Sequence, residues 1–276
     1  ISGLSLIDDP EVFNTPFYGS IIPTADLTNA FKPLEKAITY TKLEKMMLLS
    51  LHRTITASAI PSNEKVGLII SSTKGNIDVL NQTTFPKERA YLGALGSVIK
   101  DYFGFKNDAI IISNACVSGL LATAIAKRYI KEGVYNHVFI VSGDTLNPFV
   151  LSGFNSFQAM SNKPCKPFDK ERSGVNLGEA AASVLVTSTP DKLCPEAVAL
   201  LGDGSRNDAN HISGPSRTGE GLFRSITAAI KEANIPPIDI DFISAHGTAT
   251  LFNDEMEAIA FNRLGFNTTP THSLKG

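Results

Sequence analysis

The cysteine at position 116 is the residue of this chain best placed to act as a nucleophile. It lies in the small-residue stretch 113–120 (SNACVSGL), between an apolar segment at 109–112 and a helical pattern at 120–127. At such a strand-to-helix junction the helix N–H groups are unpaired and the helix dipole is positive, and both favour a thiolate. Small neighbours let a substrate carbonyl approach the sulfur. The pattern indicates a nucleophile elbow that carries sulfur.

The alternative is that Cys116 is a buried structural thiol, since free cysteines often behave as small hydrophobes. Cys165 and Cys194 lie in proline-flanked, loop-like stretches and are expected to be of this kind. Three cysteines do not make a disulfide framework, and the sequence has no Cys/His cluster at zinc spacing. We therefore expect no metal site and a reducing, cytoplasmic setting.

A histidine is the second residue with a possible chemical role. His246 ends an apolar segment within the stretch 244–250 (SAHGTAT), where glycine leaves room for a substrate. A thiol nucleophile and an imidazole are the minimum pair for acyl transfer. A lone histidine is more often a structural residue, so the interpretation of His246 depends on that of Cys116.

Two carboxylates and a lysine complete the group of candidate residues. Asp254 and Glu257 are three residues apart and share one face of the helix expected after His246. They either form an acidic first turn that the helix dipole stabilises, or they pair with a buried cation. Lys275 is the candidate cation.

Strands and helices are expected to alternate along the chain and to position these residues at strand ends. Apolar runs typical of strands buried on both faces occupy 66–70, 109–112, 137–141, 182–186 and 241–245. Helical patterns occupy 42–59, 93–103, 117–131, 219–233 and 254–264. The alternation predicts an α/β fold with a mostly parallel sheet. Cys116 and His246 each follow a strand, and ligands bind at the carboxyl ends of such strands.

The composition is that of an ordinary α/β protein. Of 276 residues, 43% are hydrophobic and 19% are charged, and the net charge is -2. No basic excess points to nucleic acid, and no apolar run approaches the roughly 20 residues of a membrane span. We expect neither nucleic acid nor a membrane as a partner.

Several motifs resemble those of the β-ketoacyl-acyl-carrier-protein synthases, the elongating condensing enzymes of the thiolase-like superfamily. The motif around Cys116 reads NACVSG, His246 begins HGTAT with Asp254 eight positions on, and Lys275 lies in SLKG. The stretch 153–161 (GFNSFQAMS) resembles the family's gating segment. The stretch 167–180, with PFDKERSG and LGEA, resembles the loop that follows it.

The resemblance implies a thiolase-like fold of two similar α/β halves in α-β-α-β-α layers, at 1–190 and 191–276, the second half incomplete. It implies that an acyl carrier protein thioester acylates Cys116, whose N–H is one oxyanion-hole donor. His246 then stabilises the charge that develops as a malonyl thioester loses carbon dioxide. The resulting carbanion attacks the acyl-cysteine, which is a decarboxylative Claisen condensation.

The same resemblance implies roles for neighbouring residues and a set of partners. Lys275 and Glu257 match an ion pair that supports the active-site histidines, Asp254 is a further supporting residue, and Phe154 matches a phenylalanine that gates the acyl pocket. Acyl- and malonyl-loaded carrier proteins are the implied partners, in a homodimer or a related heterodimer without a cofactor. Acyl chain length and pathway, whether fatty acid, polyketide or aryl polyene, stay open.

The sequence departs from the family pattern after Lys275. The family's second active-site histidine lies in a Gly-His stretch beyond this lysine, whereas the sequence ends at Gly276. His272 precedes the lysine and is expected to flank a strand. We therefore expect either a fragment of a longer chain, C-terminally truncated, or a product that cannot catalyse condensation.

Four other functions share some of these features. A thiolase pairs its cysteine with a second cysteine, and a three-carbon-starter enzyme uses His and Asn, so HGTAT with Lys275 favours the elongating synthase. A subunit of the chain-length-factor kind binds acyl chains without condensing them and generally lacks the cysteine. A papain-like Cys/His hydrolase has no use for the Phe154 segment or the lysine motif.

Overall fold

The computed structural model describes residues 3–189, 194–208 and 214–275, and the chain forms two compact units. The first, here the cysteine unit, comprises Ile21–Phe149 and Gly178–Val198. The second, the histidine unit, comprises Ile1–Ser20, Val150–Leu177 and Ala199–Gly276. The domain boundary expected at 190/191 lies outside the described residues.

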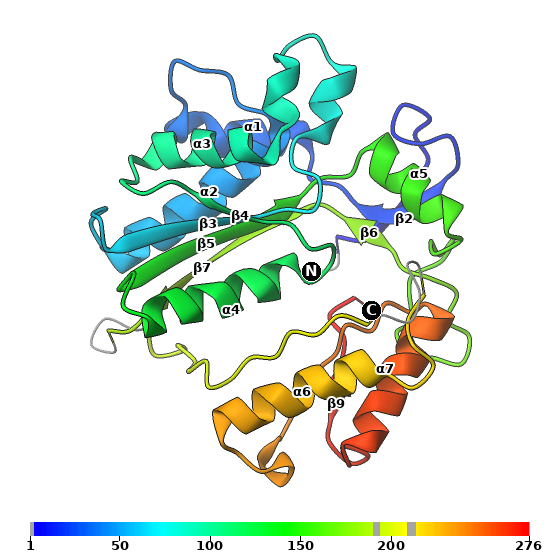
Figure 1. Ribbon diagram of the computed structural model, residues 1–276. Helices are drawn as coiled ribbons and strands as arrows, with labels where there is room; N and C mark the ends of the chain where they lie inside the picture. Colours follow the sequence, from blue (N-terminus) through cyan, green and yellow to red (C-terminus); the bar gives the residue numbers. More distant parts are fainter. Residues whose placement is uncertain (1–2, 190–193, 209–213, 276) are drawn as a thin grey trace. The chain divides into compact units, whose positions relative to one another are not determined.

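A four-stranded sheet forms the centre of the cysteine unit (Figure 1). Its order is β4 (Ile110–Ile112), β3 (Val66–Ser71), β5 (His137–Asp144) and β7 (Ala180–Thr187). As predicted, β3 runs parallel to β4 and β5, whereas β7 is antiparallel to β5. Because Ser71 at the end of β3 pairs with Ile112 and with Ser142, the parallel strands end at one edge of the sheet. The chain reaches Cys116 just beyond that edge.

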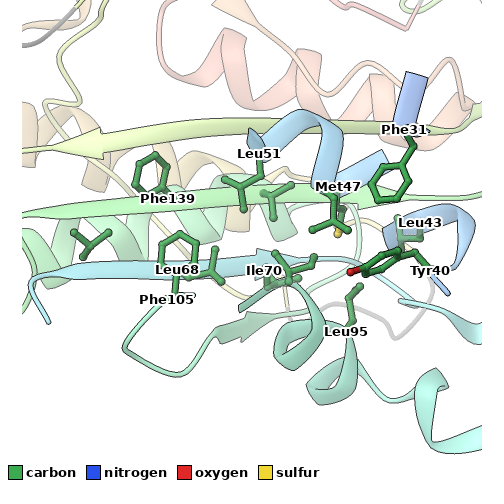
Figure 2. Packing of buried hydrophobic residues seen from close by; sticks show 14 of the residues in the cluster. Phe31, Tyr40, Leu43, Met47, Leu51, Leu68, Ile70, Leu95, Phe105 and Phe139 are labelled. Carbon is green, nitrogen blue, oxygen red and sulfur yellow. The ribbon is translucent and has the colours of Figure 1, made fainter. Parts of the chain in front are cut away.

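Helices cover both faces of this sheet. α2 (Lys42–Ser58) and α3 (Leu92–Phe103) lie on one face, with α1 (Thr24–Phe31) beside α2, and α4 (Ser118–Lys131) lies on the other (Figure 1). The side chains of successive β3 residues pack alternately on the two faces of the sheet. Leu68 and Ile70 pack in the core formed with α2 and α3, shown in Figure 2, whereas Ile69 packs with Ala122 of α4. Burial on both faces explains why this strand is apolar without alternation.

A buried ion pair supports the start of α2. Thr41 caps the helix by accepting the N–H of Glu44, whose carboxylate accepts the N–H of Thr41 in return. Glu44 is completely buried, and Arg89 satisfies its charge with Nε at 2.7 Å and Nη2 at 2.8 Å. Asn76 Nδ2 donates to the same carboxylate at 2.9 Å.

The histidine unit has less regular structure. Its helices are α6 (Glu220–Ala233) and α7 (Leu251–Arg263), which pack together, and α5 (Pro148–Ser156), whose first two residues belong to the cysteine unit. The short strands β8 (Ile243–Ser244) and β9 (Thr271–His272) pair in parallel. β1 (Ser5–Ile7) pairs antiparallel with β2 (Phe17–Ser20), and β6 (Leu177–Gly178), whose second residue belongs to the cysteine unit, completes that sheet. His246 follows β8, as predicted.

Short 3₁₀ turns connect several of these elements, at Lys32–Leu34, Ile77–Asn81, Lys87–Ala90 and Pro237–Asp239. The predicted helices agree within a few residues with α2, α3, α4, α6 and α7, whereas α1 and α5 were not predicted. α7 differs most, because it begins at Leu251, directly after the HGTAT turn, rather than at 254. Among the helices of the described residues, none is both long and apolar enough to cross a membrane.

Candidate functional site

Cys116 lies on a sharp turn between β4 and α4. Ala115, the residue before it, has a φ of 46°, a left-handed conformation that residues other than glycine rarely adopt. The hydroxyl of Ser118 holds the turn from inside, because it accepts the N–H of Asn114 at 2.8 Å and donates to the carbonyl of Ala115 at 2.7 Å. α4 begins only two residues after the cysteine. The predicted strand-to-helix elbow is thus confirmed.

The three cysteines differ in exposure. Cys116 is exposed, so it is not the buried structural thiol of the alternative interpretation. Cys165 is buried, with 6% of its surface exposed, as expected, whereas Cys194 is exposed, so the expectation of a buried thiol was wrong for Cys194. All three are free thiols.

The loop that carries His246 is held by Glu257 of α7. The two carboxylate oxygens of Glu257 accept the backbone N–H groups of His246 at 2.8 Å and of Gly247 at 2.7 Å, and Asn253 Nδ2 donates at 3.0 Å. Burial raises the pKa of the Glu257 carboxyl, and these donors oppose the rise. A carboxylate used in this way fixes the backbone of the HGTAT turn.

A glycine is required directly after His246. Gly247 has a φ of 43°, and a Cβ added there would lie 2.6 Å from Cβ of Ser273 and 2.9 Å from Cε2 of Phe168. Ser273 Oγ donates to the carbonyl of Gly247 at 2.9 Å, so the SLKG motif is bonded to the HGTAT motif. The two motifs form one structural group.

Lys275 lies against the imidazole of His246. Its Nζ is 3.1 Å from Nδ1 of His246 and also donates to the carbonyl of the same residue. An ammonium group can only donate, so Nδ1 is the acceptor and the neutral ring carries its proton on Nε2. Burial lowers the pKa of His246, and the charge of Lys275 lowers it further, whereas Asp254 acts in the opposite direction. The geometry therefore favours a neutral imidazole with an Nε2–H donor.

The expected ion pair between Lys275 and Glu257 is not present among the described residues. Glu257 is occupied by backbone N–H groups, and the ammonium of Lys275 contacts His246 instead. Spacing along the chain could not distinguish these outcomes, because backbone N–H groups compete for a buried carboxylate as well as cations do. Both residues still contact His246.

Asp254 holds a different part of the same loop. Its carboxylate accepts the N–H of Thr248 at 2.9 Å and that of Phe168 at 2.8 Å, and Nε of Arg172 lies 3.8 Å away. Asp254 is 1% exposed. It therefore joins the PFDKERSG stretch to the HGTAT turn.

Sequence reasoning missed several residues that hold this group. Arg172 donates to the carbonyl of Leu251 at 2.9 Å, and Cys165 donates its S–H to the carbonyl of Lys275. Asn176 in turn accepts the N–H of Cys165 at 2.6 Å. These contacts join residues far apart in the sequence, and no local pattern marks them.

The structure brings His246, Asp254, Glu257 and Lys275 together in the histidine unit and places Cys116 in the cysteine unit. Phe154 lies half-buried on α5, and Phe157 after it is 70% exposed. The gating role of Phe154 stays a prediction. Within the described ranges, no three His, Cys, Asp or Glu side chains are grouped so as to hold a metal ion.

Two family models match the chain over most of its length. The model of the beta-ketoacyl synthase N-terminal domain matches residues 35–192, and that of the C-terminal domain matches residues 198–275. The chain belongs to the β-ketoacyl synthase family. Cys116 lies within the first matched segment, and His246 and Lys275 lie within the second.

Relatives in this family include both fatty-acid and polyketide synthases. A 3-oxoacyl-[acyl-carrier-protein] synthase homolog of Saccharomyces cerevisiae is 29% identical over 252 residues, 84% of this chain and 57% of the relative. The 3-oxoacyl-[acyl-carrier-protein] synthase 2 of Rhizobium meliloti is 34% identical over 55% of the chain and 39% of its own length. The actinorhodin polyketide putative beta-ketoacyl synthase 1 of Streptomyces coelicolor is 31% identical over 62% of this chain and 40% of its own length. The chain spans about half the length of the curated relatives it matches.

Solved structures establish the fold of this β-ketoacyl synthase family member. The ketosynthase ApeO in complex with its chain length factor ApeC, from Xenorhabdus doucetiae, matches with a TM-score of 0.79 and 25% identity, over 98% of this chain and 70% of that one. The ishigamide ketosynthase/chain length factor matches with a TM-score of 0.84 and 23% identity, over 99% of this chain and 73% of that one. The fold is therefore the thiolase-like α/β fold of ketosynthases, as predicted.

Proposed function

We propose that this chain carries the acyl-transferring and condensing residues of a β-ketoacyl-acyl-carrier-protein synthase of fatty acid or polyketide biosynthesis. The observation that carries the proposal is the contact between Lys275 Nζ and His246 Nδ1. It leaves Nε2–H of a neutral imidazole as a donor, and a thioester carbonyl that becomes an enolate needs such a donor.

Cys116 is the residue that takes the acyl group in this proposal. Its thiolate attacks the thioester carbonyl of an acyl carrier protein, the bond from carbonyl carbon to carrier sulfur breaks, and the carrier leaves as a thiolate, which takes its proton from water. The exposed elbow and the start of α4 two residues later support this role. The product is an acyl-Cys116 thioester.

Carbon–carbon bond formation follows on the acyl-cysteine. A malonyl thioester loses carbon dioxide, and the electron pair of the broken bond forms an enolate whose oxygen accepts the Nε2–H of His246. The enolate carbon attacks the acyl carbonyl, the bond to Cys116 sulfur breaks, and the thiolate is regenerated. Lys275 positions the imidazole, and Glu257 and Asp254 hold the loop.

The partners and the setting belong to the same proposal. Acyl- and malonyl-loaded acyl carrier proteins are the substrates, Phe154 gates the acyl group, and the assembly is a homodimer or a related heterodimer. A reducing compartment such as the cytoplasm keeps Cys116 a free thiol.

Acyl transfer is tested with the full chain and an acyl-loaded carrier protein. We expect the Cys116 peptide to gain the mass of the acyl group, and the Cys116→Ala variant to gain none. Cys194→Ala removes the other exposed cysteine and should leave acylation unchanged. Absence of acylation at Cys116, or acylation of Cys194 instead, would contradict the proposal.

The role of His246 is tested by carbon dioxide release from a malonyl-loaded carrier protein. His246→Ala should keep acylation of Cys116 and lower carbon dioxide release by about 100-fold, as expected for one lost charge-stabilising donor. His272→Ala, at an exposed position on β9, is the matched control. Unchanged carbon dioxide release in His246→Ala would exclude the proposed role of this residue.

A partner subunit of the chain-length-factor kind is the second candidate, because two of the matching solved structures contain such a subunit. That function predicts acyl binding without a covalent bond. Tight retention of an acyl chain with no mass gain at Cys116 would favour it over condensation.

A further inference from the structure

The turn that follows β3 is folded around one carboxylate, that of Asp144 at the end of β5. Oδ1 of Asp144 accepts hydrogen bonds from Ser72 Oγ at 2.8 Å and from N and Oγ1 of Thr73 at 2.9 Å. The N–H of Lys74 lies 3.5 Å from the same oxygen, and Gly75 N donates to Ser72 Oγ at 2.9 Å. We call residues 72–75 the β3 turn. Oδ1 of Asp144 accepts most of these hydrogen bonds, and the N–H of Thr73 also lies 3.3 Å from Oδ2.

The β3 turn is bonded in two places to the segment that leads into the elbow. Ser72 N donates to the carbonyl of Ile112, the last residue of β4, at 3.2 Å. Ser113 Oγ donates to the carbonyl of Thr73 at 3.2 Å. A chain of hydrogen bonds therefore runs from Asp144 through the β3 turn to a position three residues before Cys116.

Hydrogen bonds, more than packing, hold the elbow: within it Val117 N donates to the carbonyl of Asn114 at 3.2 Å and Ser118 N to that of Ala115 at 3.2 Å. Residues 113–117 are exposed, so they lack the packing that fixes a buried segment. Ala115 has a φ of 46°, which an L side chain avoids unless its surroundings impose it. Ser118 bonds the elbow from the helix side. The β3 turn bonds it from the strand side.

We propose that Asp144 is a positioning residue for Cys116. Its Oδ1 holds the β3 turn, the turn holds Ile112 and Ser113, and these fix the elbow that presents the thiol ahead of α4. The effect comes from the position of the acceptor atom and not from the negative charge. The inference rests on the proposed function only in that Cys116 is the nucleophile, because positioning of the thiol is measurable without any substrate.

The experiment compares the rates at which iodoacetamide alkylates Cys116 and Cys194 in the full chain, followed by mass spectrometry of the two peptides. Cys194 is exposed in the same unit and serves as an internal reference. We call the Cys116 rate divided by the Cys194 rate the alkylation ratio. We expect Asp144→Ala and Ser113→Ala each to lower this ratio by about threefold or more, as loss of a positioning hydrogen bond does. Asp101→Ala, an exposed acid on α3, is the matched control and should leave the ratio unchanged.

The conservative variant separates geometry from charge. Asp144→Asn keeps an Oδ1 acceptor for Ser72 and Thr73, so its ratio should return to near the wild-type value. The double variant of Asp144→Ala with Ser113→Ala should lower the ratio of the Cys116 rate to the Cys194 rate no further than the stronger of the two single variants does. The reason is that both residues act through one chain of contacts.

Three results would overturn the proposal: an unchanged ratio in Asp144→Ala, a loss in Asp144→Asn as large as in Asp144→Ala, or additive losses in the double variant. Unfolding is recognised separately, because the buried Cys165 becomes alkylated when the chain opens. A different result would contradict the proposed function: Cys116 is alkylated at the normal rate but accepts no acyl group from a carrier protein.

Discussion

Lys275 Nζ lies 3.1 Å from His246 Nδ1, so the lysine meets the histidine directly and not through a carboxylate. The same ammonium group donates to the carbonyl of His246. Backbone and ring of one residue are thus held by one side chain. This arrangement fixes the proton of the neutral imidazole on Nε2 and supplies a positive charge that disfavours a second proton.

Removing the charge of Lys275 should raise the pKa of His246, because that charge is one of the two causes that lower it. We expect Lys275→Met to shift the titration of the His246 ring upward in NMR spectra recorded against pH. Lys275→Arg keeps the charge and should shift it less. A titration of His246 that is the same in Lys275→Met and the wild type would contradict the assigned contact.

Stability should depend on pH through His246 with a definite sign. Its pKa in the folded chain is below the ordinary value of 6.5, so the unfolded chain binds the proton more readily. The free energy of unfolding therefore falls as pH drops from 6.5 towards the lowered pKa. Glu257 has a raised pKa and acts oppositely: its contribution is lost as pH rises from the ordinary value of 4.5 through the folded pKa.

Urea denaturation at a series of pH values measures this effect. The difference between the wild type and His246→Gln isolates the contribution of the histidine from that of Glu257. If the slope below pH 6.5 is the same in His246→Gln as in the wild type, the imidazole is not held neutral.

Gly247→Ala should destabilise the fold by roughly 2–4 kcal/mol, because strain at a positive φ adds to overpacking. The new Cβ would lie 2.6 Å from Cβ of Ser273. Gly265→Ala is the control, since its φ is 79° and a Cβ there has nothing within 4 Å. Thermal unfolding should show a larger loss for Gly247→Ala, and equal losses would mean that the contact with Ser273 carries no cost.

Arg89→Met should destabilise the chain by about 3–5 kcal/mol, because it leaves the buried charge of Glu44 without a cation. Arg224→Met breaks an exposed pair with Glu220 on α6 and should destabilise the chain much less, because water screens that pair. Chemical denaturation of the two variants measures the contrast. Similar losses of unfolding free energy in the two variants would show that water reaches the Glu44 carboxylate, which would contradict its burial.

The sequence by itself determined the local structure around the chemistry. Apolar runs predicted the strands before Cys116 and His246, and helical patterns predicted α4 and α7, because these signals arise from neighbours in the chain. The elbow could be predicted for the same reason: strand, small residues and helix follow one another within a few positions. The family motifs were likewise local stretches of residues.

Only the tertiary structure decided what the charged side chains contact. Glu257 accepts backbone N–H groups instead of pairing with Lys275, and Asp144 organises a turn from another strand. The apolar pattern of β7 likewise did not predict that this strand runs antiparallel to β5. A buried carboxylate takes whichever donors the fold brings to it, and donors far apart in the chain meet only when the strands and helices have packed.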